Sequence, residues 1–299
     1  KGQCSFLAPA NMWYQVLAFG DNPSTLGHDY VPSVFSAYLQ EDVVVNYVFK
    51  LLPGATIRAT DDAYFLNISQ SGSSFLFTVT NATNGKPLSL SNSLAFYGYG
   101  FPSFGNPPWE GENWQPRVLG LDVRDIVVPA NIPVSIEVKT ITWLAGWYGQ
   151  EFVMDNDGSF YNLTQGELIQ ESLSKYSLHK AFVTSEKFLN LTSNSVSETA
   201  AIGFYVNVES KDLTQASSLI KTAKEFYLKR DYSTSHSYLR EAYVLITNVE
   251  NHIKEIYDSA NLTTFVGPIF LSVMAVTFGF FFSEDVRQRY IVSLIMLSI

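Results

Sequence analysis

Phe-Val-Gly-Pro-Ile-Phe-Leu-Ser-Val-Met-Ala-Val-Thr-Phe-Gly-Phe-Phe-Phe, residues Phe265 to Phe282, is the most informative stretch of this chain. None of its 18 residues carries an ionisable side chain. At a helical rise of about 1.5 Å per residue, the run is roughly as long as the hydrocarbon core of a bilayer is thick. We therefore predict a transmembrane helix over residues 264–283, with the lipid bilayer as its partner.

The residues after this span suggest a second one. Residues 284–289 form a short polar turn, and residues 290–299 are apolar again. Ten residues reach only about 15 Å as a helix, which is half the distance needed to cross. We expect residues 290–299 to begin a second transmembrane helix that continues beyond the given sequence. The alternative is a short hydrophobic tail that folds back to the interface.

Basic residues predict the orientation of the chain. Arg287 and Arg289 lie in the short turn beside the span, and the positive-inside bias keeps such turns cytoplasmic. The opposite flank offers only Lys254 within a comparable distance. The predicted localisation is therefore the cell membrane, with the bulk of the chain extracytoplasmic.

Composition and charge exclude several classes of function. The net charge of −9 argues against nucleic acid as a partner and against docking on anionic lipid headgroups. Charged residues make up only 16% of the chain, which suits an exported domain. Cys4 is the single cysteine, so the sequence permits no intrachain disulfide and no cysteine-based metal site.

Asn-x-Ser/Thr sequons suggest a glycoprotein. Outside the cytoplasm we expect surface glycosylation at four of them, Asn67, Asn81, Asn162 and Asn190. A fifth, Asn261, lies only four residues before the apolar run and is predicted to be too close to the membrane for modification. The alternative for each is an ordinary polar asparagine in a turn or at a strand edge.

Short runs of β-branched and aromatic residues predict a mainly β domain. We expect an antiparallel β-sandwich over residues 1–209, because the strand-like runs have no helical pattern between them before residue 164. In 134–143, Val134, Ile136, Val138 and Thr140 share one face, the period of a half-buried strand. The other predicted strands are 13–19, 43–51, 64–68, 74–79 and a later one at 200–208.

Helical periodicity appears in two places. A 3.6-residue pattern predicts a helix inserted at about 164–191. Two further apolar stripes, interrupted at 229–233, predict an antiparallel helical hairpin over 210–260 that acts as a stalk before the membrane. Ser210 or Asp212 is the expected cap of its first helix.

No motif in the sequence indicates catalysis, so we predict no enzyme activity, no cofactor and no metal site. The four histidines lack ligand spacing, and no nucleophile elbow, phosphate loop or dinucleotide fingerprint occurs. Residues 154–160 resemble the start of a calcium loop, but Phe160 and Gly166 stand where glycine and glutamate are required. The segment is predicted to be a turn at Asp157-Gly158 instead. Acidic pairs such as Asp61 and Asp62 could serve a glycosidase, the least favoured alternative.

One loop is the best candidate for binding. Residues 97–116 are rich in glycine and proline yet carry exposed-type aromatic and acidic side chains, a combination suited to sugar stacking or to a partner protein. The candidate binding residues are Tyr97, Tyr99, Phe101, Trp109, Glu110 and Trp114. The alternative is that these aromatics fold inward and close one end of the sandwich.

The expected function is that of a membrane-anchored, extracytoplasmic structural or interaction subunit of a cell-envelope or membrane protein complex. Its partners would then be other membrane or cell-surface proteins. A second hypothesis is the outer domain of a multi-pass transport-system permease, and a third is a carbohydrate-binding surface module that recognises glycans.

Overall fold

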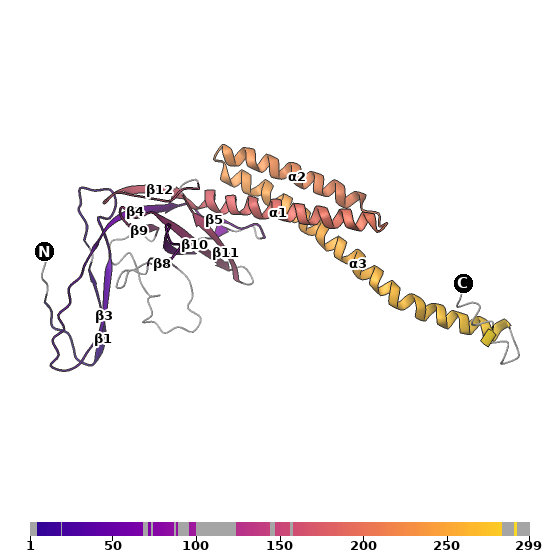
Figure 1. Ribbon diagram of the computed structural model, residues 1–299, viewed down its shortest axis with the longest axis horizontal. Helices are drawn as coiled ribbons and strands as arrows, with labels where there is room; N and C mark the ends of the chain where they lie inside the picture. The colour runs from indigo at the N-terminus through magenta and orange to yellow at the C-terminus, as the bar shows by residue number, and fades with distance from the viewer. Residues whose placement is uncertain are drawn as a thin grey trace. The chain divides into compact units, whose positions relative to one another are not determined.

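The computed structural model describes residues 5–18, 20–67, 71–72, 74–86, 88, 96–99, 124–143, 147–155, 158–282 and 290–291. The chain divides into two compact units. The first contains residues 1–184 with 223–237, and the second contains residues 185–222 with 238–299. The strands all belong to the first unit, whereas the three helices provide the described part of the second (Figure 1).

The described strands form several sheets, and nearly all of their pairings are antiparallel. One four-stranded sheet has the order β11-β10-β7-β8, a second has the order β12-β4-β2 with β9 also paired to β4, and two ribbons pair β1 with β3 and β5 with β6. Only β12 runs parallel to its neighbour, β4, among these pairings. The strands are β1 (Met12–Ala18), β2 (Tyr30–Val31), β3 (Ser33–Leu39), β4 (Leu52–Thr60), β5 (Ala63–Tyr64), β6 (Ser71–Gly72), β7 (Ser74–Asn81), β8 (Phe96–Tyr99), β9 (Asp125–Pro129), β10 (Val134–Trp143), β11 (Trp147–Met154) and β12 (Leu168–Ser172).

Three helices follow the strands: α1 (Leu173–Ala201), α2 (Asn207–Leu228) and α3 (Tyr232–Phe282). The break predicted at 229–233 falls between α2 and α3. Gly203, with φ of +105°, ends α1, because its amide and that of Phe204 bond back to Ala200 and Thr199. Helix α3 continues without interruption to the end of the apolar run. The helix in the structure is therefore much longer than the transmembrane helix predicted over 264–283.

The strand-rich unit is held together by the alternation that the sequence predicts in β10. Val134, Ile136, Val138 and Thr140 are all at most 1% exposed, while Glu137 between them faces solvent. Val134, Ile136 and Val138 join an apolar cluster that draws on both larger sheets. The described strands thus confirm a β-rich unit with mainly antiparallel pairing, but they do not show the two-layer sandwich expected from the sequence.

Two strand predictions were misplaced. Residues 43–50 form no strand and are largely exposed, and the strand lies in the next segment, β4. Strand β4 was not predicted because it contains Pro53 and Gly54, and these residue types are typical of turns. Gly54 serves close packing instead, because a Cβ there would lie 2.8 Å from the carbonyl carbon of Tyr30. The strand predicted at 64–68 likewise shrinks to the two-residue β5.

Two other predictions were wrong in type. The helix expected from residue 164 begins only at Leu173, because β12 pairs with β4, a long-range contact that overrides the helical period. The strand expected at 200–208 is the turn between α1 and α2. Helix α2 therefore begins at Asn207, before the predicted caps Ser210 and Asp212.

In the helical unit the apolar stripes predicted from the sequence are buried. The core residues on α2 and α3 are Leu213, Ala216, Ile220, Leu239, Ala242, Ile246, Val249 and Ile253. Glu209, whose side chain is 5% exposed, pairs with Nδ1 of His252 at 2.5 Å. Phe188 of α1 packs against Tyr243 of α3 with ring centroids 5.5 Å apart. This packing does not by itself establish the predicted hairpin as a stalk.

Helix α1 brings polar positions into this core, and they differ in how they are satisfied. Thr199 donates to the carbonyl of Ser195 at 2.7 Å and lies 3.2 Å from the Tyr257 hydroxyl. Thr192 is 2% exposed, and within the described part of the chain its hydroxyl has no hydrogen-bond partner. A buried, unpaired hydroxyl is destabilising because it has lost its water.

Thr192→Val should therefore stabilise the protein by about 1 kcal/mol or more, since valine keeps the shape and removes the unpaired hydroxyl. The measurement is the apparent melting temperature, by circular dichroism, of the detergent-solubilised full chain produced without glycosylation, because Thr192 is also part of the Asn190 sequon. Thr199→Val is the matched control and should lower the melting temperature, because it breaks the two contacts of that hydroxyl. A fall in melting temperature for both variants would contradict the assignment.

Candidate functional site

The C-terminal part of α3 is the most distinctive surface of the described chain. Of the described helices, only α3 is long and apolar enough to cross a membrane. Its apolar side chains point away from the protein: Phe265 is 75% exposed, Ile269 66% and Phe281 83%. Large apolar side chains in such density are otherwise buried in a soluble protein.

The polar side chains of this segment are satisfied within the helix. Four hydroxyls each donate to the carbonyl four residues earlier: Thr263, Thr264, Ser272 and Thr277, at 2.6–2.9 Å. In hydrocarbon every polar group needs an internal partner, because no water is available. The segment therefore meets both requirements of a spanning helix, length and internal satisfaction of its polar groups.

Pro268 lies inside the helix. In a helix that began at residue 264, as predicted, Pro268 would lie near the first turn, where its missing N–H costs little. Because α3 begins 36 residues earlier, at Tyr232, Pro268 is instead an interior residue. Its ring removes the amide that would bond to the carbonyl of Thr264, a position at which long helices bend.

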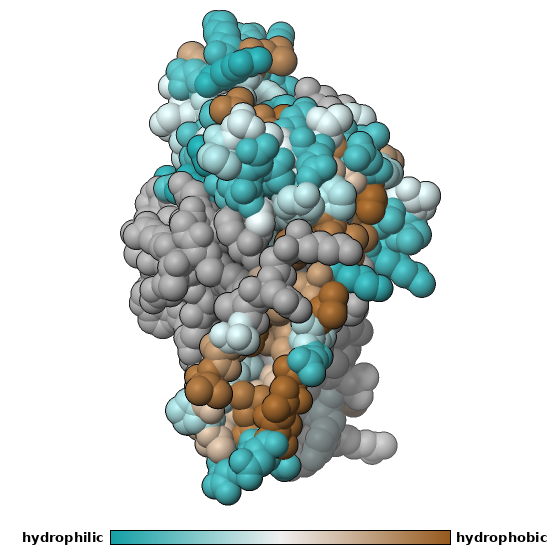
Figure 2. All heavy atoms as spheres, turned by 90° about the vertical axis from the view of Figure 1, so that its left-hand side faces the viewer, coloured by the Kyte–Doolittle hydropathy of each residue, from teal (hydrophilic) through white to brown (hydrophobic). Residues whose placement is uncertain are grey.

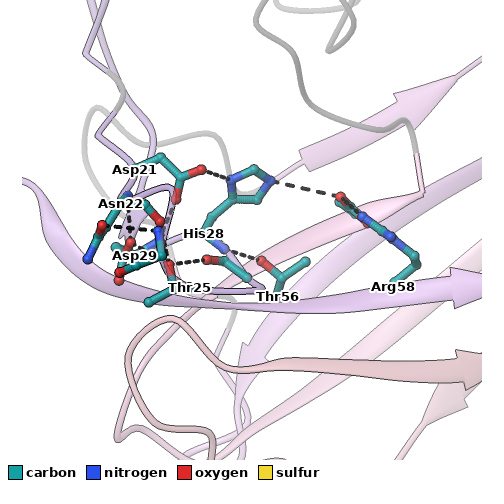
Figure 3. A network of polar contacts seen from close by, with 10 residues as sticks. Asp21, Asn22, Thr25, His28, Asp29, Thr56 and Arg58 are labelled. Carbon is teal, nitrogen blue, oxygen red and sulfur yellow. Dashed lines mark hydrogen bonds and ion pairs between the residues drawn. The ribbon is translucent and has the colours of Figure 1, made fainter.

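A second candidate is a polar network in the strand-rich unit, built around Asp29 (Figure 3). One carboxylate oxygen of Asp29 accepts from the amide of Asn22 at 2.7 Å and from the hydroxyl of Thr25 at 2.8 Å. Its carbonyl accepts from the amide of Gly54 at 2.7 Å and from the side chain of Gln165 at 3.0 Å. These bonds fasten the loop before β2 to β4 and to the turn before β12.

Close packing of the backbone completes this attachment. Gly166 has φ of +73°, and a Cβ there would lie 2.7 Å from Thr25 and 2.8 Å from the Asp29 carboxylate. The position therefore requires glycine both for its backbone conformation and for space. The Gly27 amide donates to the Gly166 carbonyl at 3.0 Å, which brings segments 139 residues apart into contact.

His28 projects from this loop between two carboxylates. Its Nδ1 lies 3.5 Å from Asp21 and its Nε2 lies 3.9 Å from Asp125, while its backbone amide donates to Thr56 at 2.8 Å. Asp125 is the buried partner, with 4% of its side chain exposed. Arg58 of β4 donates to both oxygens of Asp125, at 2.6 and 2.8 Å. Figure 3 shows the imidazole between Asp21 and the Arg58 side of the network.

The surroundings of Asp125 favour its ionised form. Burial opposes ionisation, but the two hydrogen bonds and the charge of Arg58, together with the nearby His28, outweigh burial and hold the pKa of Asp125 below its usual value. The network places a histidine beside two carboxylates. Its evident role is to connect the loop, β4 and β9.

Asp125→Asn should destabilise the protein at pH 7 by about 1–3 kcal/mol. A fully buried ion pair would lose more, but Arg58 is partly exposed and solvent screens its charge. The depressed pKa means that the ionised carboxylate contributes stability that is complete above about pH 4 and is lost as the pH falls through the folded pKa. The difference between variant and wild type should therefore shrink below pH 4.

The measurement is the apparent melting temperature at pH 7 and at pH 3. Glu151→Gln is the control, because it removes a carboxylate from the exposed pair with Lys139, at 2.7 Å, and should leave the melting temperature unchanged. An equal loss for Asp125→Asn at both pH values would show that its charge is not the cause.

A groove of about 830 Å³ lies in the strand-rich unit. Its strand wall carries Glu137, Lys139 and Glu151, and α1 contributes Lys175, His179 and Lys180. Tyr176, which also lines the groove, donates to the carbonyl of Asp155 at 2.6 Å and contacts the hydroxyl of Tyr161 at 2.9 Å. Burial raises the pKa of both tyrosines, so they remain protonated donors.

The predicted binding residues are only partly placed. Tyr97 and Tyr99 lie in β8, which pairs with β7 through Phe77 opposite Tyr97 and Phe75 opposite Tyr99. Phe101, Trp109, Glu110 and Trp114 lie outside the described residues. The structure therefore brings the two tyrosines onto one strand and does not test the binding surface as a whole.

The predicted glycosylation sites all lie within the described residues. Asn67, Asn162 and Asn190 are exposed, the last on α1. Asn81 ends β7 and is half-buried, with its side-chain oxygen accepting from the amide of Thr83 at 2.8 Å. Three sequons are thus accessible, and the fourth forms a turn.

Two acidic residues and one histidine considered for catalysis make contacts within the strand-rich unit. Asp62 pairs with Arg124 at 2.9 Å, and the Asp61 carboxylate accepts from Ser172 at 2.9 Å. His236 lies within hydrogen-bonding distance of the Phe65 carbonyl, at 2.8 Å, and stacks on Tyr64. Among the residues that the structure describes, no three His, Cys, Asp or Glu side chains are grouped to hold a metal ion.

Comparison of the chain with known protein families, with curated proteins and with solved structures finds no match. The sequence had no signal for the Asp29 network, because Arg58 and Asp125 are 67 residues apart and meet only through strand pairing.

Proposed function

We propose that this protein is a membrane-anchored interaction component, with its strand-rich unit on the extracytoplasmic side. The observation that carries the proposal is the exposed apolar segment of α3, whose hydroxyls are satisfied within the helix. Hydrophobic burial in lipid stabilises such a segment, whereas water does not. Arg287 and Arg289 support the orientation through the positive-inside bias.

In this proposal the helical unit is a stalk and the strand-rich unit is the working part. Near the start of helix α3, the His236 ring lies within hydrogen-bonding distance of the Phe65 carbonyl in the strand-rich unit. The helix then continues along the chain to the apolar segment. A continuous helix transmits position along its length better than a flexible linker. The apolar cluster common to both larger sheets supports a sandwich-like core. Accessible Asn67, Asn162 and Asn190 are the proposed sites of glycosylation.

The anchor is tested by extraction of membranes with alkaline carbonate. The wild type should stay in the membrane pellet, and Ile269→Lys with Val273→Lys and Val276→Lys should be released, because each central lysine costs about 2.5–3.5 kcal/mol on insertion. The matched control replaces three exposed apolar residues elsewhere, Val183, Ile202 and Val208, by lysine. Release of the wild type would overturn the anchor.

The side of the membrane is tested separately with a membrane-impermeant thiol reagent. A Cys4→Ser chain carrying Asn162→Cys has one thiol, at an exposed position of the strand-rich unit. We expect labelling of intact cells. Labelling that appears only after the cells are permeabilised would place this unit in the cytoplasm and overturn the orientation without affecting the anchor.

A further inference from the structure

The groove beside Tyr176 has walls of opposite charge. All of its lining residues belong to the strand-rich unit. Its strand wall comes from β10, β11 and the segment that follows β11, and it carries three carboxylates and one ammonium group. Its helix wall comes mainly from α1 and carries two ammonium groups and one imidazole. A ligand that lies between the walls therefore meets acidic groups on one side and basic groups on the other.

Most of these charged groups have a partner within the protein. Lys139 pairs with Glu151 at 2.7 Å. The ammonium group of Lys175 lies 5.1 Å from the centroid of the Tyr176 ring. The Asp155 carboxylate accepts a hydrogen bond at 3.2 Å from a backbone amide in the segment after β11. These contacts already satisfy part of the charge on each wall.

Two groove residues of opposite charge remain, one on each wall. Glu137 of β10 is exposed and lies near Lys139, but within the described part of the chain its carboxylate forms no hydrogen bond or ion pair. Lys180 of α1 is also exposed, and neither its ammonium group nor the neighbouring His179 imidazole bonds to any residue that the structure describes. A ligand with one cationic and one anionic end can pair with both walls, whereas a singly charged ligand can pair with only one.

An exposed valine lies beside each of these two charges. Val153 of β11 is directly opposite Glu137 in the register of the two strands and is 50% exposed. Val183 follows Lys180 by about one helical turn and is 51% exposed. Both valines line the groove. The groove therefore offers apolar contact as well as charge.

The volume of the groove suits a ligand of more than one residue. About 830 Å³ lies within the range of sites for drug-sized ligands, roughly 300–1,000 Å³. A single amino acid would fill only a small part of it. An extended peptide spans about 3.3–3.6 Å per residue, so a peptide of a few residues holds its terminal ammonium and carboxylate groups well apart.

From these features we propose that the groove binds a short peptide by its two charged ends. The terminal ammonium group of the peptide pairs with Glu137, and its terminal carboxylate pairs with Lys180. Val153 and Val183 contact apolar side chains of the peptide. Nucleic acids and anionic lipids fit less well, because they bring no cationic group to the acidic wall and are repelled by the net charge of −9.

The paired charges also distinguish the groove from the apolar surface of the molecule. Figure 2 shows a face on which apolar residues gather in the lower part. Such a surface does not select among apolar partners, because the hydrophobic effect is not directional. Two charges of opposite sign can select a ligand and fix the direction in which a peptide lies. The inference adds a ligand to the proposed interaction component, and it does not require the anchor.

The ligand class is tested by isothermal titration calorimetry of the full chain in mild detergent. The probe is the tripeptide alanyl-leucyl-alanine, for which we expect saturable binding. Acetylation of its amino end removes the positive charge, and amidation of its carboxyl end removes the negative one. Each change should weaken binding by up to about fivefold, the effect of losing one exposed charge pair.

Substitutions on the two walls identify which end binds where. Glu137→Gln should weaken binding of the free tripeptide but not of the acetylated one, because the acetylated peptide has no ammonium group to pair. Lys180→Met should weaken binding of the free tripeptide but not of the amidated one. Glu41→Gln and Lys86→Met are the matched controls, because they remove the same charges at exposed positions outside the groove. Both controls should bind like the wild type, and all four variants should keep its melting temperature.

Three outcomes would overturn the proposal. The first is an absence of binding by the free tripeptide, and the second is equal binding of the free and the blocked peptides. The third is binding of glycerophosphocholine without binding of the tripeptide, which would show that the groove takes the headgroup of a zwitterionic lipid. Carbonate extraction does not depend on Glu137 or Lys180, so each of these outcomes would leave the proposed anchor intact.

Discussion

The hydrophobic effect is the interaction on which the proposed anchor depends, because a long run of large apolar side chains on α3 is exposed. In hydrocarbon such a run would also need internal partners for its polar groups. Helix α3 has both features. Its large apolar side chains are exposed. The hydroxyls of Thr263, Thr264, Ser272 and Thr277 donate hydrogen bonds to carbonyls in the preceding turn of the helix. Pro268 is the exception, because it frees one carbonyl in the middle of the helix.

The strand-rich unit is held together by pairing between strands that are far apart in the sequence. Strand β4 is bonded to β12 in parallel and to β9 in antiparallel register, and the Arg58–Asp125 pair joins β4 to β9 through side chains. Asp29 and Gly166 then fasten the loop before β2 to the same strands. A buried carboxylate is tolerated here because a bidentate guanidinium and a histidine replace its lost hydration.

The apolar segment of α3 would hold the chain in a bilayer in the proposed role. The Asp29 network connects the loop before β2 to β4 and to the turn before β12, and it therefore contributes to the stability of the strand-rich unit.

Local patterns in the sequence were enough to predict the apolar helix, the alternation of β10 and the buried stripes of α2 and α3. Each depends on the period of a single element, which the order of residues records directly. Strand β4, the strand character of β12 and the partners of Asp125 were not predictable in this way. Gly54 is a residue type typical of turns, but the strand needs it because two backbones approach closely there. Residues 168–172 follow a helical period, but they pair with a strand more than 100 residues earlier. Such features are decided only when distant segments meet, because the free energy that selects them comes from contacts between those segments and not from either one alone.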